Sequence, residues 1–123
     1  MARRQISEVK KPKKRKNSRR KGCHGELEFA HFLTDRGLGA RRGQQFSGGA
    51  DSPDVVCEGL PEVHFEVKRV EAGNLYSWLD QARRDAVHKL PVVAHRKNGK
   101  DWVAIVPMDV MIDLLVQKQW SVS

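Results

Sequence analysis

The run from Val63 to Lys68 constrains the fold most, because apolar and polar residues alternate along it. An apolar residue at every second position is the period of a β-strand with one apolar face. The polar face then carries Glu66 and Lys68 side by side. A surface ion pair would be enough to explain these two residues alone. The run therefore predicts a strand that presents a carboxylate and an ammonium on the same side.

A second carboxylate favours a functional site over a surface ion pair. Asp54, in the dipeptide Pro53-Asp54, comes just before a short apolar run and can meet Glu66 on a neighbouring strand. Two carboxylates at close range repel each other unless a cation lies between them. Oxygen ligands of this kind hold Mg²⁺, and a lysine beside the ion is placed to position or activate a water. This arrangement suits metal-assisted hydrolysis of a phosphodiester.

The positive charge of the chain is concentrated at its N-terminus. Of a formal net charge of +8, residues 1–21 contribute +10, from 11 Lys/Arg and one acid, and residues 22–123 contribute −2. A segment with so little apolar surface cannot fold alone, so we expect a disordered basic arm over 1–21. Such an arm binds a polyanion through counterion release, which indicates nucleic acid; a nuclear-targeting signal or a solubilising tail is the alternative. The arm residues expected to contact DNA are Lys13, Lys14, Arg15, Lys16, Arg19 and Arg20.

The rest of the chain is expected to form one compact domain over residues 22–123. No apolar stretch is long enough to span a bilayer, and the N-terminus lacks the apolar core of a signal peptide. Cys23 and Cys57 have no zinc-type partner at the usual spacing. We expect both to be free thiols in a reducing cytoplasm.

Periodicity and turn residues predict an α/β fold, with a central mixed β-sheet flanked by helices. Helices are expected over residues 22–37 and 75–89 and after Pro107, and Asn74 is available to cap the second of them. Strands are expected over residues 40–42, 54–57, 63–70, 91–95 and 102–106. This architecture alone does not indicate a function.

Several short motifs in a fixed order resemble one group of nucleases. The chain begins its body with Gly22-Cys23-His24-Gly25-Glu26, continues with Arg42 and Ser47 around a glycine-containing loop, and then presents Pro53-Asp54 and Glu66-Val67-Lys68. This series resembles the PD-(D/E)xK nuclease superfamily, which has the restriction-endonuclease-like fold. It is most similar to the archaeal-type Holliday-junction resolvases. The resemblance spans about residues 21–95, and the C-terminal segment gives no recognisable match.

The resemblance implies a metal site and a catalytic lysine. Asp54 and Glu66 would be direct metal ligands, with the backbone carbonyl of Val67 completing the inner sphere. Glu26 would be a helix carboxylate at the edge of the site, acting through metal or water. Lys68 would hold the attacking water or steady the developing charge.

Other residues would surround this site. The resemblance implies that Arg42 and Ser47 lie near the scissile phosphate. Gln81, on the helix after the last catalytic strand, could face the site, and a solvated helix face is the alternative. His64 shares the polar face with Glu66 but is expected to be a surface histidine.

Together these observations predict a Mg²⁺-dependent endodeoxyribonuclease, in which Mn²⁺ can substitute. The resemblance further implies a homodimer that resolves branched or four-way DNA junctions. The candidates for the dimer contact are exposed apolar residues of the last helix and its tail, such as Met111, Leu115 and Trp120. Two alternatives stay open: a less selective nickase or nuclease of a phage or mobile element, and a DNA-binding protein without catalytic activity. The expected setting is a prokaryotic or phage-encoded protein of the cytoplasm, associated with the nucleoid and not with a membrane.

Overall fold

The structure is a computed structural model that describes residues 13–43 and 54–118, with side chains from Cys23 onward. Helices and strands follow one another in the predicted order. They are α1 (Lys13–Thr34), β1 (Ala40–Arg42), β2 (Val55–Cys57), β3 (Val63–Lys68), α2 (Leu75–Ala86), β4 (Leu90–His95), β5 (Val103–Ile105) and α3 (Met108–Lys118). Among these described helices, none is long and apolar enough to cross a membrane.

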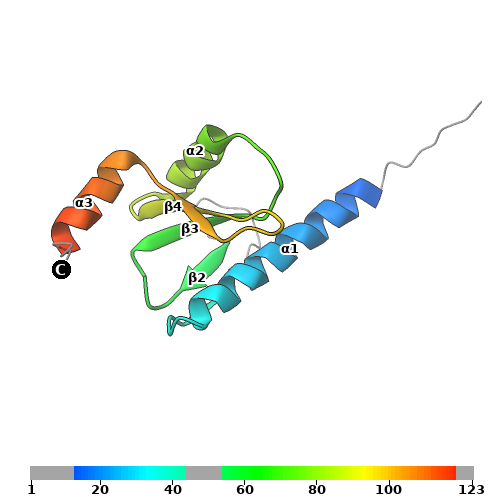
Figure 1. The fold of residues 1–123 in the computed structure, drawn as a ribbon, viewed down its shortest axis with the longest axis horizontal. Helices are drawn as coiled ribbons and strands as arrows, with labels where there is room; N and C mark the ends of the chain where they lie inside the picture. The colour runs from blue at the N-terminus through cyan, green and yellow to red at the C-terminus, as the bar shows by residue number, and fades with distance from the viewer. Residues whose placement is uncertain (1–12, 44–53, 119–123) are drawn as a thin grey trace, which may run out of the picture.

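The strands form one mixed sheet in the order β1-β2-β3-β4-β5. Strands β3 and β4 are parallel, and each of the other neighbouring pairs is antiparallel. A parallel pair needs a crossover connection, which α2 supplies. Figure 1 shows α1 and α2 on opposite sides of the sheet, with α3 at the end of the molecule away from α1. The predicted α/β, restriction-endonuclease-like architecture is confirmed.

Helix α1 covers the apolar face of β3. Phe29 on α1 meets Phe65 on β3 edge to face, with ring centroids 5.2 Å apart, and lies 4.8 Å from the ring of Trp102. Because side chains alternate along a strand, burying Phe65 on this face sets the register of β3 and turns Glu66 to the other face. The buried residues of this core are Phe29, Ala30, Leu33, Val55, Cys57, Phe65 and Ala94.

Helix α2 covers the opposite, polar face of the sheet. The side chain of Asn74 accepts a hydrogen bond from the backbone amide of Ser77 at 3.0 Å, so the predicted N-cap is confirmed. Ala82 and Ala86 are buried at 0% and 4% exposure, and their small side chains let the helix lie close to the strands. The helix ends at Ala86, before the expected end at Lys89, because Val87 adopts a φ of 58°.

The first helix also differs from its predicted bounds. It begins at Lys13, whereas the sequence pattern placed its start at Gly22. Lysine and arginine are good helix formers, so the basic sequence before Gly22 can continue the helix. Residues 1–12 lie outside the described residues. The division of the chain into a basic arm and a nuclease domain stays a prediction.

Candidate active site

Asp54 lies against the Glu-Val-Lys segment, at the start of β2. Its carboxylate oxygen Oδ2 accepts a hydrogen bond of 2.8 Å from the backbone amide of Val67 on β3. Val55 stands opposite Phe65 in the antiparallel register, and both belong to the core. By strand alternation, the neighbouring residues Asp54 and Glu66 fall on the other face of the sheet. The register thus brings the two predicted metal-binding carboxylates onto adjacent strands.

Glu66 is buried beneath α2, with 4% of its surface exposed. Its Oε1 lies 3.5 Å from Nε2 of His64, and Asp85 of α2 lies beside both residues. The expectation that His64 is a surface histidine is wrong, because its exposure is only 2%. Alternation places His64 on the polar face of β3, and the close approach of α2 encloses that face.

Lys68 lies on the same face as Glu66, two residues further along β3. Its Nζ donates a hydrogen bond of 3.2 Å to Oε1 of Gln81 on α2. Both side chains are partly buried. Of the two interpretations of Gln81, the structure therefore favours the one in which it faces the site. Gln81 holds the ammonium of Lys68 at the end of the strand.

Glu26 contacts Arg42 at the edge of the sheet. Nε of Arg42 on β1 donates a hydrogen bond of 2.6 Å to Oε1 of Glu26 on α1. This hydrogen bond raises the pKa of Arg42 above its ordinary value, and the negative charges of Glu26 and Asp54 add to the effect. Arg42 therefore stays protonated, with 42% of its side chain exposed.

The three predicted carboxylates do not form one compact cluster. Within the part of the chain that the structure describes, the only group of metal-binding residue types with all donor atoms within 4.8 Å is His64, Glu66 and Asp85. Glu26 projects from α1, which packs on the other face of the sheet, and its charge is compensated by Arg42. Ser47 lies outside the described residues, as do the side chains of the basic residues between Lys13 and Arg20.

Asp85 was not among the residues singled out from the sequence. It stands one helical turn after Gln81, and residues four apart lie on the same face of a helix. Once Gln81 is considered as facing the site, this spacing would have pointed to Asp85 as well. Its contact with His64 still depends on how α2 sits on the sheet.

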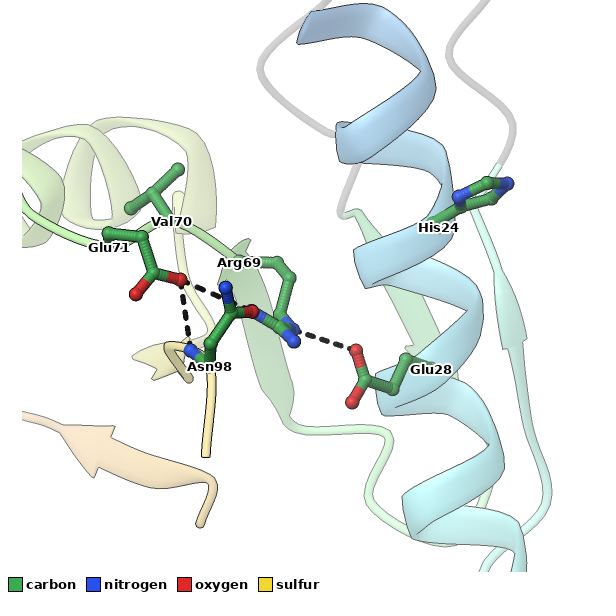
Figure 2. Close-up of a pocket in the computed structure, with 6 residues that line it drawn as sticks. All are labelled: His24, Glu28, Arg69, Val70, Glu71 and Asn98. Atoms are coloured by element: carbon green, nitrogen blue, oxygen red, sulfur yellow. Dashed lines mark hydrogen bonds and ion pairs between the residues drawn. The ribbon is translucent and has the colours of Figure 1, made fainter. Parts of the chain in front are cut away.

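A cavity of about 400 Å³ lies on the α1 side of the sheet, next to the end of β3 (Figure 2). It is lined by His24, Glu28, Arg69, Val70, Glu71 and Asn98. Arg69 bridges Glu28 on α1, at 2.9 Å, and Glu71, at 3.8 Å. Glu28 also pairs with Arg96, and the backbone amide of Asn98 donates to Glu71. Because the arginines are already paired with carboxylates, this network serves to hold α1 against the end of β3 and the segment after β4.

Comparison with known families identifies the family to which the chain is similar. The sequence model of one protein family, described as archaeal Holliday junction resolvase (Hjc), matches residues 17–121. That range includes every described strand, and also the C-terminal segment for which the motifs provided no match. Comparisons with curated proteins and with solved structures found no match. Since the matched range is nearly the whole chain, the protein belongs to the archaeal Holliday junction resolvase family.

Proposed function

We propose that the protein is a metal-dependent endonuclease that resolves four-way DNA junctions. Family membership supports nuclease action on such junctions. The observation that carries the proposal is the hydrogen bond between the Asp54 carboxylate and the Val67 amide. This bond holds one carboxylate beside the strand that carries Glu66 and Lys68, which is the arrangement needed for phosphodiester hydrolysis.

The donor atoms available here fit Mg²⁺. The carboxylates of Asp54 and Glu66 and the carbonyl of Val67 would hold the ion, and all of them are the oxygen ligands that Mg²⁺ prefers. A carboxylate as buried as Glu66 also requires a positive partner to offset its lost hydration. Glu26 would act at the edge of the site through a water molecule. When bound, the ion would polarise a phosphoryl oxygen and favour ionisation of a water; Mn²⁺ would supply the same chemistry.

The residues of the chain itself orient the reaction. Lys68 holds the attacking water and stabilises the negative charge that develops on the phosphate. Gln81 is a positioning residue, because it fixes the Nζ of Lys68 by a hydrogen bond. Arg42, charged and partly exposed, contacts the phosphate backbone near the cleaved bond. The basic residues before Gly22 supply affinity for DNA without reading its sequence.

A homodimer would provide two matched sites for the two opposed strands of a junction. Helix α3 supports this part of the proposal, since none of its residues is buried. Ile112, Leu115 and Val116 are 50%, 40% and 69% exposed. Exposed apolar side chains that gather on one helix are typical of a protein contact. Trp120, predicted to take part as well, lies outside the described residues.

Cleavage of a labelled four-way junction, a flap and a linear duplex, each with and without Mg²⁺, tests the proposed function. We expect junction cleavage that requires the metal and greatly exceeds duplex cleavage. Asp54→Asn, Glu66→Gln and Lys68→Ala should each lower the rate by roughly a hundredfold or more, the scale of losing one group that stabilises a transition state. The exposed Glu62→Gln serves as the matched control and should cut normally.

The other outcomes separate the alternatives. Equal cutting of junction and duplex would indicate a less selective nickase or nuclease. Junction binding with no cleavage under any divalent metal would indicate a DNA-binding protein without activity. If Asp54→Asn protein cuts at the wild-type rate, the assignment of the active site is wrong.

A further inference from the structure

A cluster with mixed nitrogen and oxygen donors lies under α2, on the side of Glu66 that faces His64. His64, Glu66 and Asp85 each offer a donor atom, and these atoms all lie within 4.8 Å of one another. His64 and Glu66 are 2% and 4% exposed, and Asp85 is partly buried. Strand β3 contributes the first two residues and α2 contributes the third. Asp54 does not belong to this cluster.

One nitrogen of the buried imidazole has no hydrogen bond. Among the residues that the structure describes, Nε2 of His64 is fully buried and lacks a hydrogen-bond partner. Oε1 of Glu66, at 3.5 Å, is too distant for an N–H···O hydrogen bond of normal length. A buried polar atom without a partner is unfavourable. A neutral imidazole nitrogen presents a lone pair, so a cation among the three side chains would satisfy it and both carboxylates together.

We propose that His64, Glu66 and Asp85 form a second metal site, which binds a divalent first-row transition ion such as Mn²⁺ in preference to Mg²⁺. Imidazole nitrogen is a good ligand for transition ions, whereas Mg²⁺ prefers oxygen ligands and retains much of its water. An ion at this position joins β3, which carries Lys68, to α2, which carries Gln81. It also fixes the carboxylate of Glu66, which belongs to both donor sets.

Binding of Mn²⁺ to the full-length protein, without DNA, tests this site. The paramagnetic resonance signal of free Mn²⁺ measures affinity in the presence of excess Mg²⁺, which occupies sites made of oxygen alone. Spin-echo modulation of the bound ion reports whether an imidazole nitrogen coordinates it. Wild-type protein should retain a Mn²⁺ ion that shows this nitrogen coupling. His64→Gln should abolish the coupling, and His64→Gln and Asp85→Asn should each weaken binding by at least about tenfold, the smallest loss usual for a residue that supports a metal site.

Matched variants distinguish this site from the one at Asp54. Asp54→Asn should retain the nitrogen-coupled ion, since it leaves the cluster intact. The exposed His88→Gln should bind Mn²⁺ as wild type does. Asp85→Asn changes charge with little change in volume, and thermal unfolding checks that each variant is folded.

Three results would overturn the proposal: no nitrogen-coupled Mn²⁺ in the wild-type protein, loss of that ion in Asp54→Asn, or wild-type affinity in both His64→Gln and Asp85→Asn. The inference does not depend on the proposed nuclease function, because its readout needs neither DNA nor cleavage. A protein that holds the ion but leaves junctions uncut in Mg²⁺ would contradict the function and support the site.

Discussion

Replacing Gly25 with alanine should destabilise the protein, although alanine is the better helix former. Gly25 is buried in α1 where the helix passes over Arg69, the residue after β3. An added Cβ would lie 2.4 Å from the Cβ of Arg69 and 3.1 Å from its Cγ. Carbon atoms in contact normally stand about 3.5–4.0 Å apart, so the helix and the strand end must separate.

The expected change in the free energy of unfolding follows from two opposing effects. Alanine is favoured over glycine inside a helix by about 0.8–1.0 kcal/mol, and overpacking a tight contact costs about 1–3 kcal/mol. The contact involves the Cβ of Arg69, which cannot turn aside as the end of a side chain can. We therefore expect Gly25→Ala to lower the free energy of unfolding by up to about 2 kcal/mol.

A double-mutant cycle isolates the steric effect. Arg69→Gly removes the clashing Cβ, whereas Arg69→Ala retains it. In the Arg69→Gly background, Gly25→Ala should become stabilising by about 0.8–1.0 kcal/mol, which makes the coupling energy about 1–3 kcal/mol. In the Arg69→Ala background it should still destabilise. The ion pairs that Arg69 makes with Glu28 and Glu71 do not affect the comparison of these two backgrounds, because Arg69→Gly and Arg69→Ala both lack them.

Urea unfolding followed by circular dichroism measures all of these free energies. The exposed neighbour His24→Ala is the control and should change stability by less than about 0.5 kcal/mol. A stabilising Gly25→Ala in the wild-type background would refute the reasoning, because it would mean that α1 and the end of β3 are not in the close contact described.

Three further predictions concern the reaction, the arm and the dimer. Gln81→Ala should slow single-turnover cleavage about ten- to hundredfold at unchanged DNA affinity, because Lys68 loses its hydrogen bond; a wild-type rate would remove Gln81 from the site. If about half of the basic side chains of the arm reach phosphates, deleting residues 2–20 should reduce the salt dependence of DNA binding by about four to five units of logarithmic slope. The ratio of junction to duplex affinity should change little, because the arm does not read DNA shape. An unchanged slope would show that the arm does not contact DNA. Leu115→Glu should convert a dimer to a monomer in light scattering, whereas the exposed Gln117→Glu should not; symmetric junction resolution by a wild-type monomer would contradict the dimer.

The order of the elements could be predicted from the amino-acid sequence, as could the strand that carries Glu66 and Lys68. Three features depend only on neighbouring residues in the chain, so they can be predicted from the sequence. They are the alternation from Val63 to Lys68, the apolar stripe of the helix after Asn74, and the cap at that residue. Alternation also places Glu66 and Lys68 on one face of a strand, whatever packs against it. The order of the short motifs indicated the nuclease family, and the match over residues 17–121 confirms it.

Which charged and polar side chains contact one another depends on how the helices pack on the sheet. A polar strand face is solvated unless another layer covers it, and the alternating pattern is the same in both cases. The small residues Ala82 and Ala86 bring α2 close to the sheet, and this approach buries His64 and places Asp85 beside it. Helix α1 packs on the face of the sheet opposite to α2, and there Glu26 pairs with Arg42. These contacts join residues far apart in the chain, so their geometry follows from how the layers stack and not from any local period.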